Sequence, residues 1–90
     1  MNTRKYAPDP DVQLLTAVID YSRAHAEKFD YQRTLNEWQC KFVIYIHGLA
    51  KHVHEFTPTP KQKAKTLECL DAIRAGLLGS GAVQALREVA

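Results

Sequence analysis

The chain has 90 residues, of which 46% are hydrophobic and 24% are charged, and its formal net charge at pH 7 is +2. These values are typical of a single small globular domain. They exclude a largely disordered chain, and the low net charge does not favour a polyanionic partner. The longest uninterrupted apolar run is the five residues Phe42–Ile46, which is far short of a membrane span.

The N-terminal stretch MNTRKYAPDPD contains two bases, but no apolar run follows them. This pattern predicts that the protein has no signal peptide and is cytoplasmic. In that compartment, we expect the two cysteines, Cys40 and Cys69, to be small buried hydrophobic residues, although a disulfide between them is also possible. No pattern in the sequence indicates a cofactor.

The first predicted helix follows a proline-rich start. Residues 1–8 show no periodicity, and we expect them to form a flexible arm ahead of a single helical domain over residues 9–90. Asp9 is a favourable N-cap, and Pro10 suits the first helical position. Apolar residues then recur at spacings of three and four, which predicts a helix over about residues 10–28.

The second predicted helix, over about residues 34–56, contains most of the large apolar side chains of the chain. Its start has two candidates: Asp30 as an N-cap, or the capping box in Thr34-Leu35-Asn36-Glu37. The helix should end before Pro58, because proline cannot continue a helix and also restricts the residue before it.

Apolar residues on this second helix form two adjacent rows at helical spacing. Together with Ile44, they make the middle turns apolar nearly all round, which predicts burial on more than one side. Gly48 lies between them and predicts either a close approach of another helix or a mild kink. The first row is Leu35, Trp38, Phe42, Tyr45, Leu49 and Phe56, and the second is Val43, Ile46, Ala50 and Val53.

The stretch TPKQ at residues 59–62 predicts the start of a third helix, with Thr59 as the N-cap and Gln62 completing a capping box. This helix should stop at Gly79, and Ser80 can then cap a short last helix. No segment alternates with a period of two, so we expect no strand. The expected inward-facing residues of the third helix are Ala64, Leu67, Leu70, Ile73 and Leu77.

The predicted fold is therefore all-α: a compact bundle of three long helices plus a short C-terminal helix, with the second helix at its centre. The charges are unevenly distributed along the chain. Residues 9–32 hold five acids against two bases, and residues 33–66 hold six bases against two acids. Two interpretations are open: attraction between antiparallel helices, or one weakly basic face.

The sequence contains no enzyme motif that we recognise. It lacks a G-x-S-x-G sequence, a glycine-rich phosphate loop and a C-x-x-C pair. The only acids on the second helix, Glu37 and Glu55, lie about five turns apart, too far to act as a pair. We therefore expect a protein that is not an enzyme.

Three histidines, His47, His52 and His54, cluster at the end of the second helix. His47 and His54 are too far apart along a helix to share one ion, and His52 and His54 project in nearly opposite directions. We therefore expect no metal site without ligands from another helix or chain. The stretch HEFTP at residues 54–58 is similar to the H-E-L-R-T-P box of sensor histidine kinases, although it lacks one residue before the threonine. This resemblance implies a phosphotransfer histidine, which ranks third among the functions considered.

Three lysines, Lys61, Lys63 and Lys65, form the one charge cluster. They fall in the first turns of the third helix, where the helix dipole disfavours cations. They are the candidate phosphate contacts of an alternative function, a nucleic-acid-binding accessory protein. The competing interpretation is a solvated face near a bend.

The leading hypothesis is a small non-enzymatic protein that binds and modulates, or inhibits, another protein. So few helices cannot cover a second helix that is apolar all round, and aromatic residues are enriched at the centres of interfaces. A two-fold homodimer is the simplest cover for the surplus apolar surface. Small chains without catalytic motifs are often regulators or inhibitors encoded by phages and other mobile elements. The expected partner-facing residues are Trp38, Tyr45, His47, Lys51 and His54.

Overall fold

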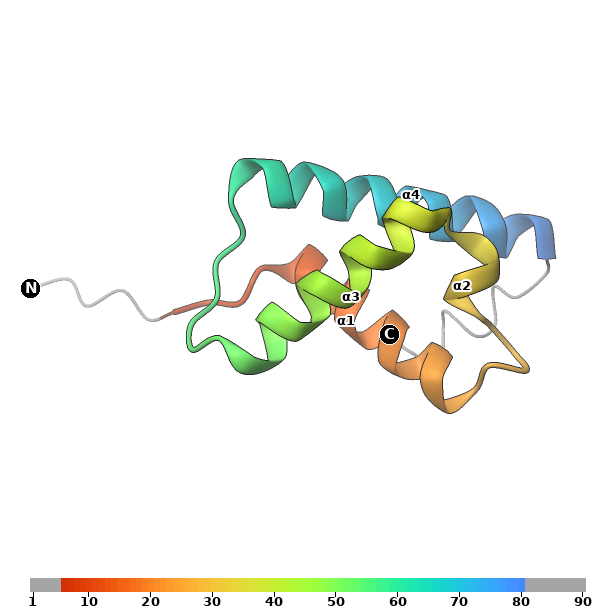
Figure 1. Cartoon of the computed structure of the whole chain (residues 1–90), viewed down its shortest axis with the longest axis horizontal. Coiled ribbons are helices and arrows are strands. Elements are labelled where there is room, and N and C mark those ends of the chain that lie inside the picture. Colours follow the sequence, from red (N-terminus) through yellow and green to blue (C-terminus); the bar gives the residue numbers. More distant parts are fainter. Residues whose placement is uncertain (1–5, 81–90) are drawn as a thin grey trace, which may run out of the picture.

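The computed structural model describes residues 6–80 and contains four helices in that range: α1 (Pro10–Ala24), α2 (Tyr31–Thr34), α3 (Glu37–His52) and α4 (Pro60–Ser80) (Figure 1). No strand occurs between residues 6 and 80, so the predicted all-α class is confirmed. The short helix expected after Ser80 lies outside this range, as does most of the expected N-terminal arm.

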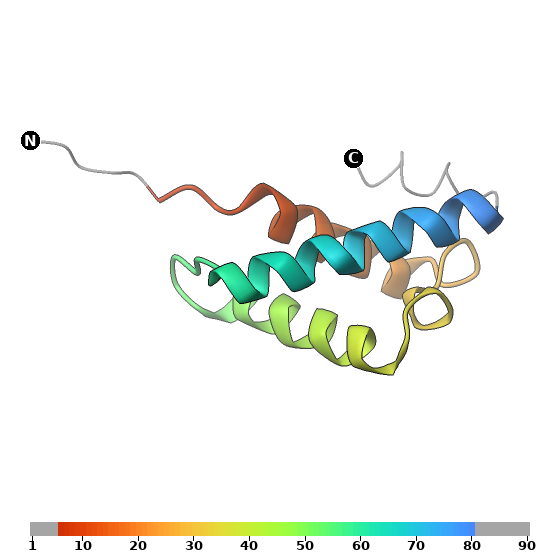
Figure 2. The same cartoon turned by 90° about the horizontal axis from the view of Figure 1, so that it is seen from above.

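The three long helices form a bundle in which α3 runs back along the long axis in the direction opposite to α4, and α1 crosses behind α3 at a steep angle (Figure 1). α1 contacts both α3 and α4, which also contact each other. Seen from above, α4 lies over the space between α1 and α3 (Figure 2). The short α2 packs against α4 at the end of the bundle where α1 ends.

The core lies where the three long helices face one another, and α1 contributes the largest share of it. Its inward face combines β-branched and leucine side chains at helical spacing, as the sequence predicts. Two residues of α3 and three of α4 complete the centre, and the segment around α2 closes one end. The buried hydrophobic residues are Val12, Leu15, Val18, Ile19, Phe29, Tyr31, Leu35, Val43, Ile46, Cys69, Leu70 and Ile73.

The break after α1 differs from the prediction. α1 begins as expected, because the Asp9 carboxylate accepts hydrogen bonds from the backbone N–H groups of Asp11 and Val12, but it ends at Ala24 rather than near residue 28. The chain then turns so that Phe29 is buried in the core. The buried hydroxyl of Ser22 accepts a hydrogen bond from the Tyr31 backbone N–H and ties this turn to α1.

Neither candidate start of the second predicted helix begins α3. Asp30 caps the separate short helix α2, and the chain becomes extended at Leu35. α3 then begins at Glu37 with a capping box between Asn36 and Gln39, not with the predicted box at Thr34. Two N-caps six residues apart therefore start two separate helices where one was predicted.

The end of α3 is four residues earlier than predicted, at His52. A straight continuation would place Phe56 on the same side of the helix as Trp38, away from the core. Instead the chain turns through Glu55, whose φ of 52° is in the left-handed region, and Phe56 packs against the core. The hydroxyl of Tyr6, which precedes α1, donates a hydrogen bond to the Phe56 carbonyl and so links this turn to the start of the chain's first helix.

α4 begins as the sequence predicts. The backbone N–H of Gln62 donates to the Thr59 hydroxyl, and the Gln62 side chain accepts from the Thr59 backbone N–H. The predicted stop at Gly79 is wrong, because α4 continues through Gly79 to Ser80. The buried face of α4 agrees with the prediction at Leu70 and Ile73, but Thr66 and Cys69 are fully buried in place of Ala64 and Leu67, which are exposed.

Candidate protein-binding surface

The two sides of α3 have different environments. Val43 and Ile46, from the second predicted row, are fully buried against α1 and α4. From the first row, Trp38 and Tyr45 are 41% and 55% exposed, and the intervening Ile44 is 48% exposed. The expectation that α3 is buried on more than one side is therefore wrong, because the bundle covers one side of this helix and leaves the other open.

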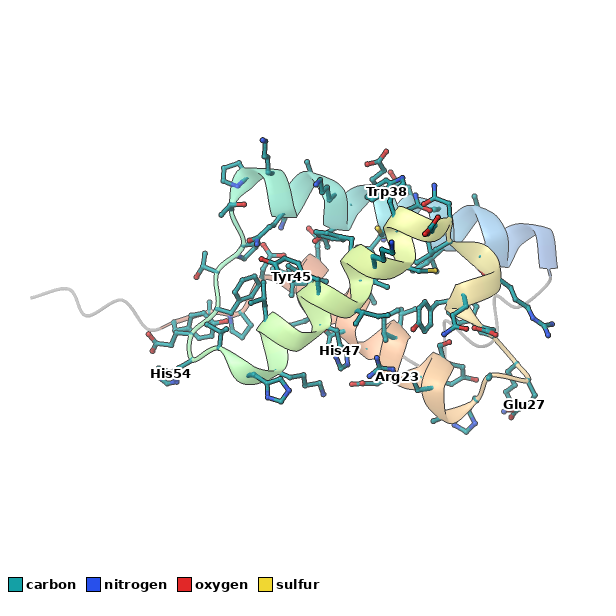
Figure 3. All side chains as sticks on the ribbon, viewed as in Figure 1. Arg23, Glu27, Trp38, Tyr45, His47 and His54 are labelled. Atoms are coloured by element: carbon teal, nitrogen blue, oxygen red, sulfur yellow. The ribbon has the colours of Figure 1, made fainter. Side chains whose placement is uncertain are left out.

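We name the open side the outer face of α3 and define it by Trp38, Lys41, Ile44, Tyr45 and Gly48. At 100° per residue these five positions fall within one arc of the helix surface. Figure 3 shows Trp38 and Tyr45 on α3, away from the helix's contact with α1. This face combines large apolar side chains with a single cation, Lys41, whose Nζ lies 3.3 Å from a Glu37 carboxylate oxygen.

Within the described residues, the side-chain position of Gly48 is open space. A Cβ atom built on it meets nothing within 4 Å, so the predicted close approach of another helix does not occur inside this bundle. A glycine in a helix interior is less favourable than alanine by about 1 kcal/mol. No packing contact of the described residues offsets this loss of helix stability at Gly48.

Tyr45 is exposed but held in place. Its ring centroid lies 6.5 Å from that of Phe42, and its hydroxyl lies 3.5 Å from the Gln62 side-chain nitrogen at the start of α4. A side chain that is already ordered loses less conformational entropy when a partner covers it. Tyr45 is thus a suitable anchor for a protein contact.

His47 and Lys51, two of the predicted partner-facing residues, contact α1. His47 Nε2 lies 2.7 Å from one Asp20 carboxylate oxygen, and Lys51 Nζ lies 3.0 Å from the other. Burial raises the pKa of Asp20, but the hydrogen bonds and charges of His47 and Lys51 outweigh it, and the pKa of this carboxyl is lowered overall. The spacing of four residues, which places both side chains on one edge of α3, here joins two helices of the same chain.

The predicted partner-facing set does not form one continuous patch. His54 lies in the turn after α3, with 94% of its side chain exposed, and its only ion pair in the structure is with the adjacent Glu55 at 3.9 Å. Figure 3 places it at the opposite end of α3 from Trp38, with His47 on the lower edge. Of the predicted set, Trp38 and Tyr45 lie on the same side of α3. Ile44 lies on this side as well, although its position in the apolar middle turns predicts burial.

The lysine cluster of the alternative function is divided as well. Lys63 Nζ lies 2.6 Å from Asp9 and 2.8 Å from Asp11, so this cation bridges the first turns of α4 and α1. Hydrogen bonds to Asp11 and Asp9 raise the pKa of Lys63. Lys61 and Lys65 are exposed. The unfavourable position of Lys63 near a helix N-terminus is thus offset by two carboxylates from α1, which leaves two of the three lysines for a phosphate backbone.

These bridges decide between the two interpretations of the charge pattern. The acids of the first third of the chain meet bases of the later segments at two places: Asp20 with Lys51 and His47, and Asp9 with Lys63. The unequal distribution of charge therefore contributes to attraction between α1 and the two helices packed against it, although these helix pairs are not antiparallel.

A groove of about 660 Å³ lies between the first half of α1 and the turn that follows α3. Val12, Ala50 and Phe56 are among the apolar residues that line it. Two of its carboxylates, on Asp9 and Asp20, are already neutralised by the ion pairs described above. The sequence does not predict this groove, because its two walls are about forty residues apart in the chain.

Cys40 and Cys69 are both free thiols, and Cys69 is fully buried. Burial raises the pKa of Cys69 to about 11 and also raises that of Cys40. A raised pKa keeps a thiol protonated and therefore unreactive. Their role in this structure is packing, as the sequence predicts for small buried hydrophobic residues.

Within residues 6–80 no three His, Cys, Asp or Glu side chains come together in a way that could hold a metal ion. In the same part of the chain, none of the helices has the length and apolar character needed to cross a membrane. The geometry of this region is thus that of a helical scaffold with one open apolar face. Comparisons with models of known protein families, with curated proteins and with solved structures found no match.

Proposed function

We propose that this chain is a non-enzymatic interaction protein of the cytoplasm that binds another protein through the outer face of α3. The observation that carries the proposal is the exposure of Trp38, Ile44 and Tyr45, between 41% and 55%, on one side of one helix. Single exposed apolar residues are ordinary, but a cluster of large ones marks an interaction site.

The composition of the outer face also supports a protein partner. Trp and Tyr are enriched at interface centres, where they bury a large area at a low cost in conformational entropy. An aromatic centre with polar residues at its margin is the usual anatomy of such a surface. Binding through one helix face would make the chain a regulator or an inhibitor, including one carried by a phage, since covering a partner's surface is enough to modulate it.

A photo-crosslinking experiment tests this proposal. A photoreactive phenylalanine analogue at position 45, in protein added to a lysate of the source cells, should give adducts of defined mass, and mass spectrometry would identify the second chain. Adding Trp38→Ala to the same protein should reduce the yield several-fold, because it removes an aromatic anchor from the same face.

Leu67 on α4 provides the matched control. It is as exposed as Trp38, at 41%, but belongs to a different helix. The same photoreactive residue at position 67 should give only weak, heterogeneous adducts. Equal yields from positions 45 and 67, with no effect of Trp38→Ala, would show that the outer face of α3 is ordinary surface and would refute the proposal.

A further inference from the structure

We infer that the partner of the outer face of α3 is a second copy of this chain, with the two α3 helices packed antiparallel about a two-fold axis that passes between Ile44 and Tyr45. This inference rests on the proposed function, since it requires the outer face to be a protein-binding surface. It adds the identity of the partner, the direction of the two helices and their register.

The spacing of residues along α3 is symmetric about this axis. Ile44 and Tyr45 are adjacent to it, Lys41 and Gly48 are equally far from it on either side, and so are Glu37 and His52 at the two ends of the helix. All six positions fall on the outer side of α3 at 100° per residue. An antiparallel pair therefore brings Lys41 of each copy against Gly48 of the other, and it places the two Ile44 side chains together on one edge of the interface and the two Tyr45 side chains together on the other edge.

Gly48 has a function in this arrangement that it lacks inside the bundle. Among residues 6–80, no atom outside its own helix comes within 4 Å of a Cβ atom placed there. In the antiparallel pair, the missing side chain lets the aliphatic stem of Lys41 from the second copy lie against the backbone of α3. The unexplained glycine and the exposed aromatic residues thus have one common explanation.

The charges at the ends of α3 select the antiparallel direction. Glu37 is the acidic residue of the first turn, and Lys51 and His52 are the basic residues of the last turn. Antiparallel packing places Glu37 of each copy beside the basic end of the other, and it also aligns the two helix dipoles favourably. Parallel packing would place Glu37 against Glu37 and Lys51 against Lys51, which is repulsive.

Trp38 and Lys51 project toward opposite edges of the outer side of α3 at 100° per residue. The antiparallel pair therefore places Lys51 of one copy on the edge beside Glu37 of the other, and Trp38 covers the opposite edge. Lys51 Nζ also contacts Asp20 of its own chain, and about half of its side chain remains exposed.

The first test is the mass in solution, by sedimentation equilibrium over a wide range of concentrations. We expect the full chain to associate to twice its mass of 10.2 kDa. Gly48→Leu should weaken this association at least tenfold, because the new side chain fills the space that Lys41 of the second copy occupies. Circular dichroism and thermal unfolding of the variant should show an intact helical fold, since position 48 contacts no other element of its own chain.

Ala64→Leu is the matched control for this variant. Ala64 is exposed on α4, so the substitution adds a side chain of similar size to the surface outside the proposed interface. It should leave the dimerisation constant unchanged. Equal effects of Gly48→Leu and Ala64→Leu would overturn the inference.

A charge exchange tests the register. Glu37→Lys and His52→Glu should each weaken association severalfold, because each places like charges together across the interface. The double variant should recover most of the loss, because it restores opposite charges in both symmetric contacts. Only an interface between two copies, in antiparallel order, predicts this recovery, and a double variant weaker than both single variants would overturn it.

The inference and the proposed function can fail separately. A wild-type chain that stays at 10.2 kDa at all concentrations overturns the inference. If position 45 then crosslinks a different protein and Trp38→Ala reduces that adduct, the proposed function stands and only the identity of the partner was wrong. A monomer that also gives no specific adduct at position 45 overturns both.

Discussion

The two sides of α3 are made from similar amino acids but have opposite roles. Ile46 is fully buried between α1 and α4, whereas Ile44, two residues earlier on the same helix, is 48% exposed. Val43 and Tyr45 differ in the same way. In a helix that is apolar nearly all round, hydrophobicity therefore does not identify the side that the fold buries. The apolar residues of the outer side contribute little to the core and are the basis of the proposed protein contact.

The largest expected effect is the difference in stability loss between alanine substitutions at Ile46 and at Ile44. Ile46→Ala should lower the free energy of unfolding by about 2–4 kcal/mol, because it removes buried methyl groups and leaves a cavity. Ile44→Ala should change it by less than about 0.5 kcal/mol, because the side chain is on the surface. Urea unfolding, with protein concentration kept low to limit association, measures both values. Equal losses would contradict the assignment of inner and outer sides.

The two helix-interior glycines sharpen the comparison. A Cβ atom at Gly76 would overlap the Thr34 methyl group of α2, whereas one at Gly48 would meet nothing. Gly76→Ala should therefore destabilise the fold by about 1 kcal/mol through overpacking. Gly48→Ala should stabilise the isolated chain by up to about 1 kcal/mol through helix propensity. Thermal unfolding of dilute protein measures both changes.

A second substitution checks the cause at Gly76. Thr34→Ser removes the methyl group that the new Cβ atom would meet, so the double variant Thr34→Ser, Gly76→Ala should recover much of the lost stability. Additive losses in the double variant would mean that the close contact between α2 and α4 is not the reason for this glycine.

The smallest expected effect concerns the ion pairs of His47 and Lys51 on α3 with Asp20 on α1. The pKa of Asp20 is lowered in the folded chain, so the folded state binds fewer protons than the unfolded state in acid. The stabilisation is complete above the ordinary carboxyl pKa of about 4 and is lost as pH falls through the lower folded value. Asp20→Asn should therefore reduce the loss of unfolding free energy that occurs as pH falls below about 4. The expected reduction is about 0.5 kcal/mol, because Asp20 is half exposed.

Salt provides the control for that measurement. The ion pairs of Asp20 with His47 and Lys51 are partly exposed, so high salt should screen them and reduce the difference between Asp20→Asn and the wild type. Unfolding measured from pH 2 to pH 7 at low and high salt gives both quantities. A difference that is independent of pH would show that these contacts do not link α1 to α3 energetically.

Much of the fold follows from local sequence patterns, namely helix caps and the spacing of apolar residues. Asp9 caps α1, and Thr59 with Gln62 caps α4, because a short polar side chain next to a helix start satisfies the free backbone N–H groups wherever the rest of the chain lies. The all-α class follows similarly from periodicity. The errors occur where local signals compete, as at Asp30 and Asn36, each of which caps its own helix.

The candidate site was less predictable than the fold. Residue type predicts Trp38 and Tyr45 as partner-facing, and both are exposed, whereas it does not predict that His47 and Lys51 pair with Asp20 on α1. Lys63 was assigned to a phosphate backbone although it binds Asp9 and Asp11. A charged side chain in a sequence shows no partner, because the opposite charge can lie twenty or fifty residues away.

The sequence by itself determined the helical class, the caps of α1 and α4 and the presence of surplus apolar surface on α3. These depend on spacing and on residues within one helical turn of each other. Only the tertiary structure decided which side of α3 is buried, where Phe56 turns back to the core and which charges are already paired. Each of those results depends on the positions of α1 and α4 around α3, and packing between distant segments sets those positions.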